Sequence, residues 1–445
     1  MALGVATAAW FRISLQTFGG PAGQIAVMHR ELVEERRWFA EDRFLHALNY
    51  CMLLPGPEAQ QLATYLGWLL NGTLGGLIAG ALFVLPGFVA ILVLSLVYAR
   101  FGDTAAVEAL LAGAAPAVLG IVASAVVRVG KRALSNRLLT VIAVLAFVAL
   151  SLFAVPFPVV VLAAAAVGAV GSRLRPEVFQ PSTHGVDADD DGASDVEALV
   201  LHRVAPSWGR AARVVGLGAV VWGVPVVACV ALFGRGSIFV TQAMFFSGAA
   251  VVTFGGAYAV LAYIAQRAVN TYHWLLPGEM LKGLAMAETT PGPLIQVVQF
   301  VGCVGAFRNP GDLDPWVAGI VASVLVTWVT YVPCFVWIFL GAPHIEALRS
   351  NARLGGALAG ITAAVVGVIA NLALYFAVHT LFDRAREFRW AAVRVTLPDP
   401  TTIDVPAAAV AALAMVLIFR MRWSVLRTLG ACLVAGAVLY AATAG

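Results

Sequence analysis

Phe18-Gly19-Gly20-Pro21, followed later by Pro55-Gly56-Pro57, is the stretch that decides the fold, because most of it occurs twice in the chain. At a constant offset of 236 positions, Phe18-Gly19-Gly20 aligns with Phe254-Gly255-Gly256, and Pro55-Gly56-Pro57 aligns with Pro291-Gly292-Pro293. Glycine and proline that interrupt apolar segments at matching points of two halves are the best sequence pointer to a transport site.

Composition places the rest of the chain in a membrane. Apolar residues make up 61% of the 445 residues, charged residues 12%, and the mean hydropathy is +0.90. Soluble domains carry about 25% charged residues, so we expect an all-α polytopic membrane protein. The net charge of +4 gives no indication of a nucleic-acid partner. The five cysteines have no paired or CxxC spacing and are interpreted as core residues rather than disulfides or metal ligands.

About ten or eleven membrane spans are predicted from the apolar segments. These segments are 3–27 (kinked), 73–99, 106–127, 138–153, 156–172, 212–232, 238–265 (kinked), 315–341, 355–380, 404–420 and 425–443. The runs 44–54 and 57–70, on either side of the first Pro-Gly-Pro, are each too short for a span of about 20 residues. They form either one broken span or a re-entrant helical hairpin, and the basic residues before and after them favour the hairpin.

Two hydrophilic stretches lie outside these segments. The charged stretch 28–46 is interpreted as an interfacial loop, and 173–210, which is rich in acidic residues, as a linker. The predicted domains are therefore a first repeat over 1–172, the acidic linker over 173–210, and a second repeat over 211–445. The relative orientation of the halves stays open, because the run 212–232 is long enough to cross by itself.

The repeated motifs suggest how a divalent anion could be held in lipid. Backbone N–H groups at the N-termini of half-helices can replace water around an anion, and the helix dipole adds to the attraction. The glycines of the motifs allow close approach of the backbone, and Pro57 and Pro293 are expected in the first turns of the following helices. The alternative is that these residues only kink helices for packing, which two copies at identical spacing disfavour.

Three charged residues are candidates for anion or proton handling. Arg12 lies in the first apolar segment, where a charge is usually functional or paired, although it could also reach the interface from a helix end. Glu58 begins a half-helix and is either a proton carrier or an N-terminal charge. Glu288 precedes the second Pro-Gly-Pro and is the matching proton-coupling candidate.

The predicted anion-binding residues combine both repeats. They are Arg12, Phe18, Gly19, Gly20, Pro21, Gln24, Pro55, Gly56, Pro57, Gln60, Phe254, Gly255, Gly256, Thr290, Pro291, Gly292, Pro293 and Gln296. The chain has no HExxH, GxSxG, Walker or dinucleotide-binding pattern in a suitable context. We therefore expect a secondary transporter without catalytic residues, cofactor or metal, rather than an enzyme or an ATP-driven pump.

These motifs resemble a known family. Phe18-Gly19-Gly20-Pro21, Arg36-Arg37-Trp38 and Leu54-Pro55-Gly56-Pro57-Glu58-Ala59-Gln60-Gln61 closely resemble the signature of the chromate ion transporter family, and the second copy resembles the second domain of its long-chain members. The resemblance implies a multi-pass inner-membrane protein that exports chromate, with proton-coupled exchange, halves of opposite orientation, and sulfate as a structural mimic. The expected partners are the anion, protons and the lipid bilayer, and a homodimer stays open.

The second copy departs from the first at three places. Pro21 aligns with Ala257, Glu58 with Leu294, and Arg36-Arg37 with Tyr272-His273. This asymmetry suggests that the first half carries more of the anion and proton handling. The alternatives are transport of sulfate or another tetrahedral oxyanion and, from a different class, a membrane-embedded sensor or enzyme without flux.

Overall fold

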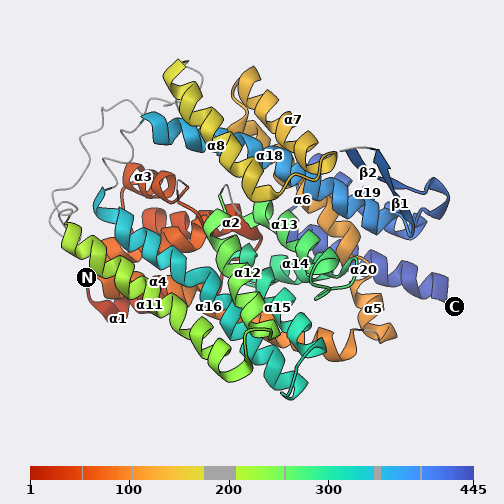
Figure 1. The fold of residues 1–445 in the computed structure, drawn as a ribbon, viewed down its shortest axis with the longest axis horizontal. Helices are drawn as coiled ribbons and strands as arrows, with labels where there is room; N and C mark the ends of the chain where they lie inside the picture. Colours follow the sequence, from red (N-terminus) through yellow and green to blue (C-terminus); the bar gives the residue numbers. More distant parts are fainter. Residues whose placement is uncertain are drawn as a thin grey trace.

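The computed structural model describes residues 1–52, 54–102, 104–174, 207–254, 257–344, 352–390 and 393–444. Within these ranges the chain is almost entirely helical (Figure 1). Seven of the described helices are long and apolar enough to cross a membrane, and four shorter apolar helices accompany them. The predicted class, an all-α polytopic membrane protein with two repeated regions, is confirmed. Most of the predicted acidic linker lies outside the described residues.

The described helices divide between the two halves in chain order. The first half comprises α1 (Leu3–Ser14), α2 (Gly20–His29), the π-helical segment η1 (Arg30–Glu35), α3 (Glu41–Cys51), α4 (Glu58–Phe101), α5 (Ala105–Leu111), α6 (Ala114–Ala133), α7 (Arg137–Ser151) and α8 (Phe157–Leu174). The second half comprises α12 (Ile238–Val252), α13 (Ala257–Asn270), α14 (Glu279–Thr289), η2 (Leu294–Gln296), α15 (Val297–Arg308), α16 (Pro315–Gly341), η3 (Ala342–His344), α18 (Ala352–Leu381), α19 (Val405–Met415), η5 (Val416–Arg420) and α20 (Val425–Ala444). Between them, α11 (Trp208–Phe233) packs on α16, where Trp328 Nε1 donates to the Val221 carbonyl at 2.8 Å.

The charged stretch 28–46 is largely helical, so its interpretation as a loop is wrong. Helix α2 continues into η1, whose backbone closes with Arg36 N–H donating to Glu31 O at 3.1 Å. In a π-helix the residues at i and i+5 are bonded neighbours. The ion pairs Arg30–Glu35 and Glu31–Arg36 have this spacing, and so does the contact between His29 and Glu34. The wider turn therefore brings opposite charges together.

Helix α4 is a helical hairpin rather than one continuous rod. Asn71 and Gly72 have non-helical backbone angles and reverse the chain between two limbs. The limbs pack through small residues, because a side chain added at Gly67 would collide with Ala79 and one added at Gly80 would collide with Thr64. In the second half a longer connection, residues 309–314, joins α15 to α16 at the corresponding point.

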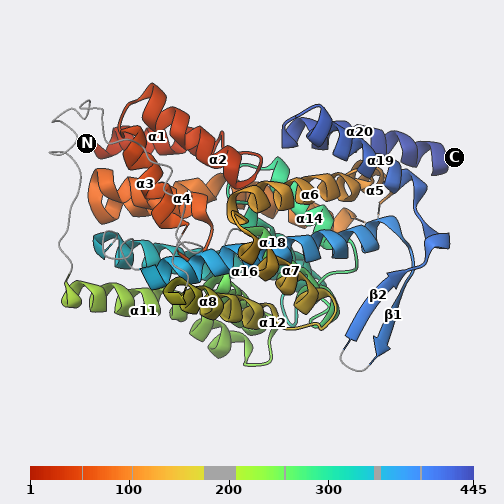
Figure 2. The same cartoon turned by 90° about the horizontal axis from the view of Figure 1, so that it is seen from above.

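The two halves exchange their last helices. The long helix α18 of the second half packs against α7 and α8 of the first half, while α19 and α20 pack against α6 (Figure 2). Small residues permit these crossings: Gly360 lies on the backbone of Ala164, Gly356 lies on Gly168, and Gly120 meets Ala414. Close packing through small residues is the main attraction between helices in lipid, where hydrophobic exclusion is absent.

A two-stranded antiparallel hairpin was not predicted. Strand β1 (Ala385–Trp390) pairs with β2 (Val393–Pro398), with Ala385 opposite Pro398 and Trp390 opposite Val393. The Arg394 N–H donates to the Leu152 carbonyl at 2.6 Å, which ties the hairpin to the α7–α8 corner. The β-branched residues in Val393-Arg394-Val395-Thr396 are the sequence pattern that indicates a strand. The basic residues of this region make that pattern hard to recognise.

Candidate functional site

The second Pro-Gly-Pro is joined to the first Phe-Gly-Gly. The amide of Gly292 donates to the Thr17 carbonyl oxygen at 3.0 Å, directly before Phe18. The carbonyl oxygen of Gly292 accepts a 2.6 Å hydrogen bond from Nε2 of the buried Gln24, which lies on α2. This junction therefore combines a break from each half.

The reciprocal junction has the same backbone bond. The amide of Gly56 donates to the Thr253 carbonyl oxygen at 2.7 Å, directly before Phe254. Both donors and both acceptors are related by the 236-residue offset. Phe18 and Phe254 also match, because each donates its amide two residues back, to Gln16 at 3.0 Å and to Val252 at 3.1 Å. Gly255 and Gly256 lie outside the described residues.

Positive φ angles make glycine necessary at the centres of both Pro-Gly-Pro turns. Gly56 has φ +130° and Gly292 has φ +103°, values that residues with a Cβ rarely adopt. Space is also restricted. A Cβ at Gly56 would lie 2.9 Å from Cys334 Sγ, and one at Gly87 of α4 would collide with the Pro291 carbonyl.

One junction carries an acid and a phenol that its counterpart lacks. Glu288 is fully buried, and Tyr258 Oη donates to its Oε1 at 2.5 Å. A Cβ built at Gly20 would lie 3.6 Å from Glu288 Oε2, so the carboxyl group lies against the first residue of α2. The aligned positions in the other repeat hold Met52 and Ala22. The polar junction is thus built from residues of both halves.

Buried glutamines surround the junctions. Gln60 and Gln296 occupy equivalent positions, and their Nε2 groups donate to Thr64 and Thr327 respectively, both at 3.1 Å. Among the described residues, the Oε1 atoms of both amides and Oε2 of Glu288 are buried without a hydrogen-bond partner. An amide can present either its oxygen or its NH₂ group after rotation, so these side chains could donate to an oxyanion.

The prolines and Thr290 have structural roles in the turns rather than roles as hydrogen-bond donors to an anion. Pro57 and Pro293 are the N-cap residues of α4 and η2, one position before the predicted first turn, while Pro21 lies in the first turn of α2. Pro55 O accepts from Gln61 Nε2 at 2.8 Å. The buried Thr290 hydroxyl donates to the Ala287 carbonyl at 3.3 Å.

The amides of Gly56 and Gly292 are not free, which corrects the idea that the centres of both turns present unpaired N–H groups to an anion. They are used to hold the two halves together. The half-helix N-termini at the breaks of the first repeat are those of α2, which begins at Gly20, and α4, which begins at the half-buried Glu58.

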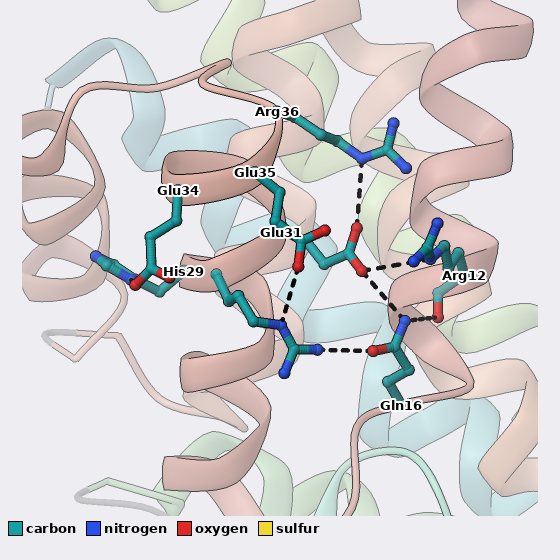
Figure 3. Close-up of polar contacts among 8 residues, drawn as sticks. Arg12, Gln16, His29, Glu31, Glu34, Glu35 and Arg36 are labelled. Atoms are coloured by element: carbon teal, nitrogen blue, oxygen red, sulfur yellow. Dashed lines mark hydrogen bonds and ion pairs between the residues drawn. The ribbon is translucent and has the colours of Figure 1, made fainter.

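Arg12 lies with a different partner. Its side chain is 64% exposed, and its Nε is 3.4 Å from Oε1 of Glu31, which is buried (Figure 3).

Sequence reasoning missed Tyr258, Gly87 and Glu31. The only signals were a phenol inside an apolar run, a glycine beside Pro86, and an acid within a charged stretch.

Two arginines on α6 lie near the acidic residues of the junctions. Helix α14, which carries Glu288, packs on α6. Arg128 of α6 lies within electrostatic reach of Glu288, and Arg132, one turn further on, lies within reach of Glu58. In the sequence, Arg128 and Arg132 belong to the basic residues that follow the two short runs and indicate membrane topology.

Two repeats with interrupted helices, joined reciprocally at their glycine-proline breaks among membrane-spanning helices, define a membrane transporter. The fold by itself therefore indicates the class of protein, a membrane transporter.

The chain belongs to the chromate transporter family, whose sequence model matches residues 6–169 and 240–439. It is 33% identical over 368 residues to the chromate transport protein of Pseudomonas aeruginosa, covering 81% of this chain and 78% of that protein. It is also 26% identical to the chromate transport protein of Cupriavidus metallidurans (84% and 82% covered) and 27% identical to a probable chromate transport protein of Synechococcus elongatus (82% of each). No solved structure matches significantly.

Proposed function

We propose that this protein is a secondary transporter that exports chromate across the inner membrane, with transport coupled to protons. The observation that supports it best is the reciprocal pair of bonds, Gly56 to Thr253 and Gly292 to Thr17, which brings the breaks of both halves into contact. Chromate is chosen as cargo because three similar proteins carry chromate transport in their names.

Electrical energy favours export of a dianion. Moving one charge through 100 mV is worth about 2.3 kcal/mol, so two negative charges leaving an inside-negative cell gain about 4.6 kcal/mol. That energy supports a concentration ratio of about three orders of magnitude. The potential alone can therefore drive efflux of the dianion, and the proposed role of the proton is to control binding rather than to supply driving force.

The proton-coupling groups proposed here are Glu288 and Glu58. A dianion at the N-terminus of α2 would lie beside Gly20, where Glu288 and Tyr258 already meet. Two negative groups in that place would repel each other strongly in a medium of low dielectric constant. Protonated Glu288 removes this repulsion, so a proton and the anion are expected to bind together.

The test is uptake of labelled chromate by everted membrane vesicles. Accumulation that depends on this protein supports export, whereas vesicles that accumulate no chromate under any proton gradient or potential contradict it. Competition at equal concentration then decides between chromate and sulfate, because the two tetrahedral dianions are similar in size and charge. Absence of flux for both, with retained chromate resistance in Arg12→Ala or Glu58→Gln cells, would favour a sensor or an enzyme.

A further inference from the structure

A nearly inaccessible carboxylate lies between two arginines at the end of α1. The side chain of Glu31 is 1% exposed; its Oε1 lies 3.4 Å from Arg12 Nε and its Oε2 lies 3.4 Å from Arg36 Nε. Gln16 Nε2 donates to Glu31 Oε1 at 3.2 Å, and Gln16 Oε1 accepts from Arg30 Nη2 at 2.7 Å (Figure 3). Two donors from the end of α1 and the residues after it, and a third from directly after η1, thus converge on one carboxylate.

The second repeat shows that the backbone does not need this cluster. The turn after η1 is closed by Trp38 N–H donating to Leu32 O at 2.8 Å, and the equivalent Trp274 donates to Ala268 O at 2.8 Å. The preceding residues also share a positive φ, 50° at Arg37 and 53° at His273. The same turn therefore forms twice.

The cluster is confined to the first repeat. In the second repeat the four positions of the cluster hold Gly248, Val252, Arg267 and Tyr272. The Arg12 side chain is 64% exposed, and ion pairs with a solvent-exposed partner contribute little net stability. Neither the turn nor stability therefore requires two arginines and an acid at these positions.

The chemistry of the donors fits a tetrahedral divalent anion. Each arginine contacts Glu31 through Nε, while four of the five N–H donors of a guanidinium are on its Nη atoms. Arginine forks match carboxylate and phosphate-like oxyanions alike. Two arginines also supply two positive charges, which a dianion neutralises fully and a single carboxylate only by half.

We propose that Arg12, Gln16 and Arg36 form a binding site for a tetrahedral divalent oxyanion, and that Glu31 occupies it in this conformation as an internal counter-anion. The proposal rests on the proposed function and deepens it, because it names a site where the cargo is first held. The dianion and the Glu31 carboxylate compete for the same donors. Glu31 is therefore a positioning residue that sets how tightly the arginines accept the anion.

Equilibrium binding of sulfate and of chromate to the purified full-length protein tests this. Glu31→Gln removes the competing charge and keeps the shape, and is expected to tighten binding by about tenfold. Arg12→Gln and Arg36→Gln are each expected to weaken it by at least tenfold. Glu34→Gln is the matched control, because Glu34 lies in the same segment, is 61% exposed and contacts His29 instead. The Glu34→Gln protein should bind both anions with the affinity of the unmodified protein.

Unchanged affinity in folded Glu31→Gln, with unchanged affinity in Arg12→Gln, would overturn the inference. If Glu31→Gln does not fold, modification of the unaltered protein by phenylglyoxal gives a second measurement. Saturating sulfate should then protect Arg12 and Arg36 but not Arg213, and equal labelling with and without sulfate contradicts the site. Failure of the unaltered protein to bind or transport any oxyanion would instead reject the proposed function.

Discussion

The amide of Gly292 and the carbonyl oxygen of Thr17 form a 3.0 Å hydrogen bond between residues 275 positions apart. The equivalent bond in the other direction joins Gly56 to Thr253 at 2.7 Å. The Pro-Gly-Pro turn of each half is therefore bonded to the interrupted helix of the other.

This relationship predicts that Gly292→Ala and Gly56→Ala abolish transport and destabilise the protein. A Cβ at φ +103° or +130° is strained by about 1–2 kcal/mol, and contacts with Gly87 or Cys334 add to that. The melting temperature in detergent and vesicle uptake measure both effects. Gly223→Ala, in α11 with open space around it, is the control and should be neutral. Normal transport by both junction variants would show that the turns tolerate a side chain.

Chromate binding should depend on pH through Glu288. When the pH falls and this carboxyl takes up its proton, repulsion toward the dianion disappears, so affinity is expected to rise. Glu288→Gln, which is neutral at every pH, should bind chromate tightly at high pH and lose most of the pH dependence. Binding of sulfate, which stays a dianion over the whole range, measured between pH 5.5 and 8.5 beside that of chromate checks this.

Glu108→Gln is the control for the pH experiment, because Glu108 is exposed on α5 and contacts Tyr440. It should keep the pH profile of the unaltered protein. A Glu288→Gln protein with an unaltered profile would remove Glu288 from proton coupling and leave Glu58 as the candidate.

The exchanged helices depend on glycine at their crossing. Gly360→Val should separate α18 from α8, because a side chain there meets the backbone of Ala164. Overpacking of this kind costs about 1–3 kcal/mol. Gly355→Val, on the same helix with no atom within 4 Å, isolates the local effect of valine on helix stability. Chromatographic homogeneity and thermal unfolding should distinguish the two variants, and equal behaviour would argue against the crossing.

An ion pair between the partly exposed Arg308 and the buried Glu279 links α14 to α15. Nη1 and Nη2 of Arg308 donate to Glu279 at 2.6 and 2.7 Å, and Tyr98 Oη donates to the same carboxylate at 2.8 Å. Arg308→Gln leaves the acid without its cation and should destabilise the protein by about 3–5 kcal/mol.

The double variant Glu279→Gln/Arg308→Gln should recover part of the loss, because it leaves no buried charge. Thermal unfolding of the single and double variants measures the recovery. If the double variant is less stable than Arg308→Gln alone, the pair does not act through charge compensation.

Much of the architecture was predictable because it depends on local composition. The predicted segment 315–341 coincides with α16, and 138–153 and 156–172 differ from α7 and α8 by a few residues at their ends. The breaks after α1 and α12 also lie where the Phe-Gly-Gly motifs predict them. The η1 segment and the hairpin 385–398 were missed, because π-helical pairing and short strands leave weak signals in a charged stretch.

The site was only partly predictable. Glu288 and the glycines were identified from the motif, but Tyr258 and Glu31 gain their roles from neighbours far away in the chain. The charge of Arg12 in an apolar segment predicts a functional or paired residue, and the structure shows that its acidic partner is Glu31. Whether either set binds the anion stays a prediction that the binding experiments address.

The sequence by itself determined the apolar spans, the duplication at 236 positions and the points where helices break, because hydropathy, glycine and proline act within a few residues. Only the tertiary structure decided that each Pro-Gly-Pro bonds to the opposite half, that the last helices are exchanged, and that Glu31 lies between two arginines. Those contacts join segments far apart in the chain through small residues and backbone groups, and every residue carries the same backbone groups, so the sequence cannot indicate which of them will meet.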